Sequence, residues 1–249
     1  MNLSYMPLSA GDRLGPYEIL ALLGAGGMGE VYRARDPRLK RDVAIKVSAA
    51  QFSERFEREA QAIAALNHPN ICQIYDVGPN YLVMECIEGA PLTGPLPLEK
   101  GLQYATQIAS ALEAAHQKNI IHRDLKLGNI LVTGTGVKVL DFGLAKVAEA
   151  KKPAGGPQSG ATQTMSFTEA GTIVGTAAYM SPEQAKGEDV DARSDIFSFG
   201  VVLYEMLSGR QPFAANSFVE TMSAILRDEP AALDAPAHVS GIVTRCLRK

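Results

Sequence analysis

The octapeptide His122-Arg123-Asp124-Leu125-Lys126-Leu127-Gly128-Asn129 is the most informative part of this sequence. It follows the apolar pair Ile120-Ile121 and precedes the apolar run Ile130-Leu131-Val132, which predicts a charged loop that leads into a strand. A charged loop of this kind is commonplace when it occurs alone. Asn129, five residues beyond Asp124, makes it specific. A carboxylate can accept a hydrogen bond from a hydroxyl, and an amide oxygen can bind a metal ion.

A second charged motif, Asp141-Phe142-Gly143, comes directly after the strand pattern Val137-Lys138-Val139-Leu140. In isolation these letters mean little. Placed after the Asp124 loop, Asp141 is the natural ligand for Mg²⁺, which prefers hard carboxylate oxygens.

A glycine run, Gly24-Ala25-Gly26-Gly27-Met28-Gly29, lies between two strand patterns, Tyr17–Leu23 and Glu30–Ala34. A dinucleotide-binding turn would require a helix after the glycines, with an acidic residue about 20 positions further on. A strand follows here instead, so the turn is predicted to be a hairpin. Glycines let a backbone approach anionic phosphates closely. A plain hairpin is the commoner interpretation of such a run, but Lys46, at the end of a third strand pattern Asp42–Val47, favours a phosphate lid.

Lys46 could simply be a strand-end lysine that extends into water. The next segment changes this interpretation, because Ser53 is a suitable N-cap and apolar residues then repeat at helical spacing. Glu59 falls within that apolar stripe, where a carboxylate needs a cation. We therefore predict an ion pair between Lys46 and Glu59.

These motifs, with Val43-Ala44-Ile45-Lys46 and Ser181-Pro182-Glu183, follow the order of the protein kinase signature. Phosphoryl transfer needs each part: a lid over the phosphates, a lysine, metal ligands, and a base that orients the hydroxyl. From about Tyr17 to its end, the chain resembles the bacterial branch of eukaryotic-type (Hanks-type) serine/threonine protein kinases. His68-Pro69-Asn70 and Gly175–Gln184 also fit that pattern.

The resemblance implies a serine/threonine protein kinase that transfers the γ-phosphoryl group of ATP with Mg²⁺, or alternatively Mn²⁺. Asp124 would orient the acceptor hydroxyl, Lys126 would neutralise developing charge, and Glu59 would hold Lys46 against the ATP phosphates. The catalytic residues implied are Asp124, Lys126, Asn129 and Lys46, and the metal ligands are Asn129 and Asp141. The implied nucleotide-binding positions are Leu23, Gly24, Ala25, Gly26, Gly27, Met28, Gly29, Val31, Ala44, Lys46, Glu59, Met84, Glu85, Ile87, Leu131 and Asp141. Within this set, Leu23, Val31, Ala44 and Leu131 would sandwich the adenine ring, Met84 matches the gatekeeper, and Glu85 and Ile87 would bind adenine through backbone groups.

The resemblance also implies a regulatory apparatus. Its internal spine corresponds to Ile63, Ile74, His122 and Phe142, with Asp195 anchoring its base. His122 is interpreted as a packed structural histidine and not as the general base. Thr168 and Thr172, eight and four residues before Thr176, match the activating phosphothreonines of relatives. Arg123 would bind their phosphate. Thr176 is expected to be a structural hydroxyl that meets Asp124 and Lys126, and with Lys126 it is typical of Ser/Thr specificity.

Three departures from the family pattern are present. Leu127 replaces a usual proline, and Phe197 replaces a common tryptophan. The chain stops at Lys249, where relatives continue with an arginine-bearing segment and a last helix. Glu183 is therefore expected to lack its arginine partner, and the chain is expected to be C-terminally truncated.

The chain divides by pattern into an arm at 1–16, a strand-rich N-lobe at 17–88 and a helix-rich C-lobe at 89–249. The predicted fold is α+β and bilobal: a small antiparallel sheet with one main helix, followed by a larger, mostly helical lobe. Helices are expected over Leu98–Gln117 and over Arg193–Ser208, and the latter is apolar all round and so buried. The segment 151–171 is rich in Gly, Pro, Ser, Thr and Gln and is expected to be mobile.

Composition excludes several classes of function. The net charge is −3 with both signs interspersed, so binding to nucleic acid is not expected. Three scattered cysteines indicate reduced thiols and a cytoplasmic location. No stretch is long and apolar enough to predict membrane contact within this segment, although a longer parent protein could be tethered to a membrane.

The expected partners are proteins that bear Ser or Thr, together with a second kinase copy for trans-autophosphorylation. Two other classes compete with this prediction. A non-catalytic module on a kinase fold is disfavoured because Lys46, Asp124, Asn129 and Asp141 are all present. A small-molecule phosphotransferase is disfavoured by the 43-residue stretch from Asp141 to Glu183, which resembles a peptide-docking segment.

Overall fold

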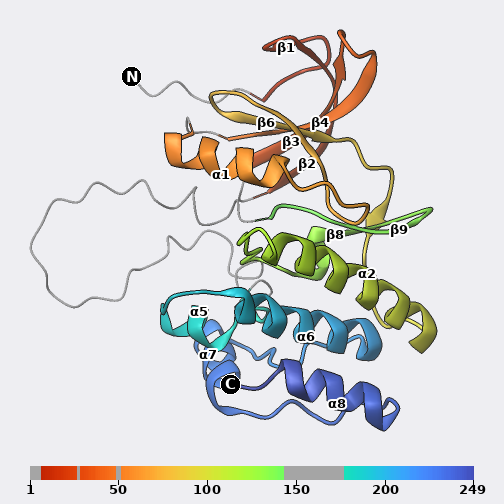
Figure 1. Ribbon diagram of the computed structural model, residues 1–249, viewed down its shortest axis with the longest axis vertical. Helices are drawn as coiled ribbons and strands as arrows, with labels where there is room; N and C mark the ends of the chain where they lie inside the picture. Colours follow the sequence, from red (N-terminus) through yellow and green to blue (C-terminus); the bar gives the residue numbers. More distant parts are fainter. Residues whose placement is uncertain (1–6, 27–28, 49–51, 143–176) are drawn as a thin grey trace, which may run out of the picture.

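A twisted antiparallel sheet opens the chain in the computed structural model, which describes residues 7–26, 29–48, 52–142 and 177–249. Its strand order is β1-β2-β3-β4-β6-β5 (Figure 1). The strands are β1 (Arg13–Leu14), β2 (Tyr17–Gly26), β3 (Gly29–Asp36), β4 (Arg41–Val47), β5 (Ile74–Val77) and β6 (Tyr81–Glu85). Strands β2, β3 and β4 agree with the three strands predicted around the glycines and Lys46.

The two faces of this sheet serve different cores. Side chains alternate along a strand, so Val43, Ile45 and Val47 of β4 join a cluster on one face. Ala44 and Lys46 lie on the opposite face. Within the register, Ala44 pairs with Met84 and Val31 pairs with Lys46. The sheet thereby places the predicted lysine beside the predicted nucleotide-binding residues.

One helix, α1 (Glu54–Ala64), packs against β5. The Ser53 side chain caps it by accepting a hydrogen bond from Phe56 N at 3.3 Å. Its buried residues are Phe56, Ala60 and Ile63. The helix predicted from Ser53 onward is confirmed.

The second part of the chain is mainly helical and lies below the sheet in Figure 1. Its helices are α2 (Leu98–His116), α5 (Pro182–Lys186), α6 (Ala192–Ser208), α7 (Phe218–Arg227) and α8 (Ala237–Cys246). Helix α6 is central, because it contacts both α2 and α8 and buries residues on every side. It ends at Gly209, whose φ of 70° is the left-handed conformation that glycine adopts easily. The predicted buried helix is therefore confirmed.

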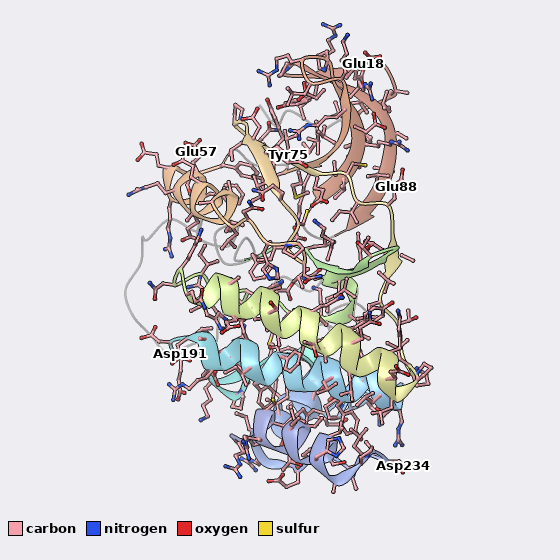
Figure 2. All side chains as sticks on the ribbon, turned by 45° about the vertical axis from the view of Figure 1, so that its right-hand side comes forward. Glu18, Glu57, Tyr75, Glu88, Asp191 and Asp234 are labelled. Carbon is pink, nitrogen blue, oxygen red and sulfur yellow. The ribbon has the colours of Figure 1, made fainter. Side chains whose placement is uncertain are left out.

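A small sheet of β7 (Ala90–Pro91), β8 (Ile130–Thr133) and β9 (Gly136–Val139) lies between the two parts. The hairpin of β8 and β9 is green in Figure 1. Glu88, labelled in Figure 2, lies on the connection that joins β6 to β7. The predicted α+β, bilobal architecture is confirmed.

Two further details complete the fold. Strand β5 begins only at Ile74, because Ile71 forms a parallel bridge with Val139 of β9 instead of joining the larger sheet. No helix among the described residues is long and apolar enough to span a bilayer.

Candidate active site

The loop before β8 places two predicted residues, Lys126 and Asn129, around the carboxylate of Asp124. Asp124 Oδ2 accepts hydrogen bonds from Lys126 Nζ at 2.8 Å and from Asn129 Nδ2 at 3.0 Å. Asn129 Nδ2 also donates to the backbone oxygen of Asp124 at 2.8 Å. The short helix η1 (Leu127–Asn129) turns the chain so that Asn129 faces back toward Asp124. This geometry fixes the orientation of the carboxylate while leaving it 15% exposed.

Asp195 anchors this loop from below. It lies in the first turn of α6 and is 1% exposed. Its carboxylate accepts from His122 N at 2.8 Å, from Arg123 N at 2.9 Å and from His116 Nε2 at 2.7 Å. Three donors satisfy a buried charge that would otherwise be costly. The catalytic loop is thereby joined directly to the central helix of the C-lobe.

His122 is fully buried and bonds to backbone through both ring nitrogens. Nε2 donates to the Leu140 oxygen at 2.8 Å, and Nδ1 accepts from Asp124 N at 3.3 Å. Its ring lies 4.6 Å from that of Phe142. Burial lowers the pKa of the imidazole, with the nearby carboxylate of Asp195 opposing this shift. These contacts agree with the structural interpretation of His122.

Arg123 adopts a left-handed backbone conformation with φ of 68°. Its carbonyl accepts from Gln184 Nε2 at 2.7 Å, which ties the loop to α5. Its Nε atom is buried and makes no hydrogen bond within the described part of the chain. A buried guanidinium nitrogen without a partner is costly, so this atom is suited to receive an anion.

Lys46 and Asp141 form an ion pair in the structure. The distance from Lys46 Nζ to Asp141 Oδ2 is 2.8 Å, and the two side chains are 15% and 23% exposed. Asp141 has φ of 56°, again in the left-handed region. The contact joins β4 of the N-lobe to the residue that follows β9.

The predicted pair between Lys46 and Glu59 is wrong for this structure. Glu59 instead accepts from Arg55 Nε at 2.9 Å, one helical turn away on the same helix. Its side chain is 30% exposed and does not face the core as the apolar stripe suggests. Glu59 therefore forms its ion pair with a neighbour on α1, and Lys46 forms its ion pair with Asp141 of the other lobe.

Glu183, which is expected to lack its arginine partner, has a hydroxyl partner in the structure. This half-buried carboxylate accepts a hydrogen bond from the hydroxyl of Ser194 in α6. The Ser194 hydroxyl is thus the partner of the Glu183 carboxylate, where relatives are expected to have an arginine.

The predicted adenine-binding residues lie on several strands of the two sheets. Gly24 of β2 pairs with Val31 of β3, and Ala44 of β4 pairs with Met84 of β6. Leu131 comes from β8, and Leu23 of β2 is 54% exposed. The backbone of Ile87 makes no hydrogen bond to any other described residue. Gly29 has φ of 112°, and a Cβ at this position would collide with the backbone oxygen of Val47.

The donor set around Asn129 and Asp141 fits a magnesium ion. Both N–H bonds of the Asn129 amide point to Asp124, which leaves the amide oxygen as a ligand. Leu140 N donates to the Asn129 backbone oxygen at 2.8 Å, so the residue preceding Asp141 is tied to Asn129. An amide oxygen and a carboxylate are hard oxygen ligands of the kind that Mg²⁺ prefers.

Several predicted positions lie outside the described residues. They are Gly27, Met28, Gly143, Thr168, Thr172, Thr176 and the segment 151–171. Two contributors, in contrast, were missed by sequence reasoning and are placed by the structure. These are His116, which bonds to Asp195, and Gln184, which bonds to Arg123. The position of His116 at the end of an amphipathic helix gives no signal of this role.

Comparison with known proteins agrees with this geometry. The sequence model of the family described as "protein kinase domain" matches residues 17–244. The chain belongs to the protein kinase family. Its relatives include the serine/threonine-protein kinase PknB of Mycobacterium leprae, 42% identical over 86% of this chain and 36% of that protein. A probable serine/threonine-protein kinase of Streptomyces coelicolor is 43% identical over 88% of this chain and 34% of its own length. PknA of Mycobacterium tuberculosis is 39% identical over 94% of this chain and 57% of its length.

The chain therefore spans well under half the length of most of these curated relatives. The resemblance to bacterial serine/threonine kinases that the motifs indicated is confirmed.

Proposed function

We propose that this kinase domain transfers the γ-phosphoryl group of ATP to serine and threonine hydroxyls of proteins. The observation that carries the proposal is the Asp124 carboxylate, held by Lys126 at 2.8 Å and by Asn129 at 3.0 Å. In this arrangement Asp124 accepts a hydrogen bond from the acceptor hydroxyl and orients its oxygen for attack. The Lys126 ammonium then neutralises charge that develops on the transferred group.

Nucleotide binding in this proposal uses the two lobes together. Leu23, Val31, Ala44 and Leu131 enclose the adenine ring, and backbone groups of the connection after β6 bind its edge. The glycines from Gly24 to Gly29 cover the phosphates, and Lys46 binds them. Asn129 and Asp141 would hold Mg²⁺ or Mn²⁺, which supplies charge neutralisation for the phosphates when bound. The lobes divide near Gly89, with residues 17–88 and 89–249 on either side.

Regulation is proposed to act through Arg123. Its buried Nε without a described partner suits a phosphate. Thr168 and Thr172 are the proposed phosphothreonines, formed by a second copy of the kinase. Preincubation with MgATP should therefore raise the rate of phosphate transfer by the wild type. The double variant Thr168→Ala/Thr172→Ala should stay slow. Identical time courses would contradict this role of Arg123.

The proposed compartment is the cytoplasm, where ATP and reduced thiols coexist, and the three cysteines are unpaired in the structure. Incubation with MgATP and a generic basic protein, followed by phosphosite mass spectrometry, tests the function as a whole. Phosphoserine or phosphothreonine in the acceptor supports the proposal. Absence of both, in a protein that binds ADP, would favour a non-catalytic module.

A further inference from the structure

Residues 70–73 of the N-lobe run along a strand of the C-lobe. Val139 N donates to the Asn70 oxygen at 2.8 Å, and Cys72 N donates to the Val139 oxygen at 2.9 Å. Asn70 Nδ2 adds a bond to the Val137 oxygen at 2.7 Å. This interlobe seam brings β9 against the segment that links α1 to β5.

One ion pair closes the seam beside the end of β6. Lys138 Nζ of β9 lies 2.7 Å from Glu85 Oε2, although the two residues are 53 positions apart. The side chains are 20% and 26% exposed, so both charges are largely removed from water. Gln73 of the seam bonds to Glu85 twice, donating its N–H to Oε2 at 3.3 Å and accepting the Glu85 N–H at 2.9 Å.

Glu85 is consequently fixed at both its backbone and its side chain. It is the last residue of β6, and the connection that carries Ile87 begins directly after it. A pair shielded from water is weakened less by salt than an exposed one and holds its partners more firmly. Lys138 is thus the C-lobe anchor for the strand end that precedes the proposed adenine-binding backbone.

We propose that Lys138 and Glu85 are a positioning pair that sets the backbone at residues 85–87 for the nucleotide base. This inference rests on the proposed function, because it requires that the connection after β6 binds adenine. The pair touches no reacting atom. It acts by ordering the base-binding backbone before the nucleotide arrives, which lowers the cost of binding.

Isosteric neutral variants test the pair. Lys138→Met removes the charge and keeps the aliphatic stem, and Glu85→Gln keeps an acceptor for Gln73 N. Each should raise the Kd for ADP, and the KM for ATP, by about threefold to thirtyfold. For Lys138→Met, the kcat with a protein acceptor should stay within about twofold of wild type, because Lys138 lies outside the catalytic loop and the proposed nucleotide-binding residues. Lys186→Met is the matched control, because the one ion pair of Lys186 within the described residues is an exposed pair with Glu188 at 4.0 Å.

Two further readouts separate positioning from a general loss of stability. The double variant should bind ADP as well as the weaker single variant does, since both changes remove one shared interaction. The loss of ADP affinity should be equal with and without Mg²⁺, because the pair is proposed to affect binding of the base and not of the phosphates. Melting temperatures identify any variant that fails to fold, and the other single variant then carries the test.

Unchanged ADP affinity in a folded single variant, or additive losses in the double variant, would overturn the pairing. A loss seen only with Mg²⁺ would also overturn it, because the effect would then reach the nucleotide through Asp141. A wild-type protein that binds no ADP would instead overturn the proposed function itself.

Discussion

Lys46 of β4 and Asp141 after β9 share an ion pair of 2.8 Å, while Glu59 of α1 pairs with Arg55 at 2.9 Å. Lys46, the cation predicted to pair with Glu59, is therefore paired with Asp141, the proposed metal ligand. An Asp141 carboxylate that binds a metal ion is less available to Lys46. Lys46 then needs another anion, and Glu59 is its predicted partner.

Variants of Glu59 and Arg55 should consequently differ in their effects on activity. Glu59→Gln should lower kcat about tenfold to a hundredfold, because a hydrogen bond to a charged group contributes about 1.5–3 kcal/mol. Arg55→Ala removes the competing cation and should keep or raise the initial rate. The measurement is steady-state phosphorylation of a basic protein under saturating MgATP. Wild-type kcat in Glu59→Gln would show that Glu59 takes no part in the working arrangement.

Asp195 should contribute strongly to stability. Replacing it with alanine strands the buried N–H groups of His122 and Arg123 and should lower the free energy of unfolding by about 3 kcal/mol or more. The control is Asp191→Ala on the same helix, since Asp191 is an exposed N-cap whose loss costs about 1 kcal/mol. Urea unfolding measures the loss of stability in both variants, provided that the m-value is unchanged. Equal losses in the two variants would mean that Asp195 contributes no more to stability than an exposed helix cap does.

His122 should make stability depend on pH. Burial lowers the pKa of its imidazole in the folded state, so the unfolded chain binds the proton more readily. The stability contributed by neutral His122 is complete above the ordinary histidine pKa of about 6.5. It declines as the pH falls from there toward the folded pKa. Imidazole resonances followed by NMR from pH 8 to pH 5, about the range where histidine titrates, should show His122 gaining its proton at a lower pH than an ordinary histidine does. A pKa at or above 6.5 would contradict this account.

The pattern of neighbouring residues was sufficient to predict most of the helices and strands. The alternation in β4, the cap at Ser53 and the apolar residues of α6 are properties of neighbouring residues, and each element appears where its pattern predicts it. The grouping of Asp124 with Lys126 and Asn129 was likewise predictable, because these contacts join residues only a few positions apart. Helix α7, by contrast, was not predicted, although Ser217 caps it.

Contacts between distant segments could not be predicted in this way. The choice of Glu59 between Arg55 and Lys46 depends on how α1 is turned against the sheet, which its apolar spacing does not specify. Ser194 and Glu183, His116 and Asp195, and Glu85 and Lys138 meet only after the helices and strands have packed. For each pair, the sequence shows two polar residues without indicating that they meet.

The central claim is that Asp124 orients the hydroxyl that attacks ATP. Asp124→Asn keeps the shape of the side chain and an acceptor oxygen, yet removes the charge that Lys126 and Asn129 hold in place. The most direct measurement compares this variant with wild type for ADP affinity and for phosphate transfer to a basic protein. We predict unchanged ADP affinity and a loss of turnover on the order of a hundredfold or more. Wild-type turnover in a folded Asp124→Asn protein would contradict the proposed mechanism.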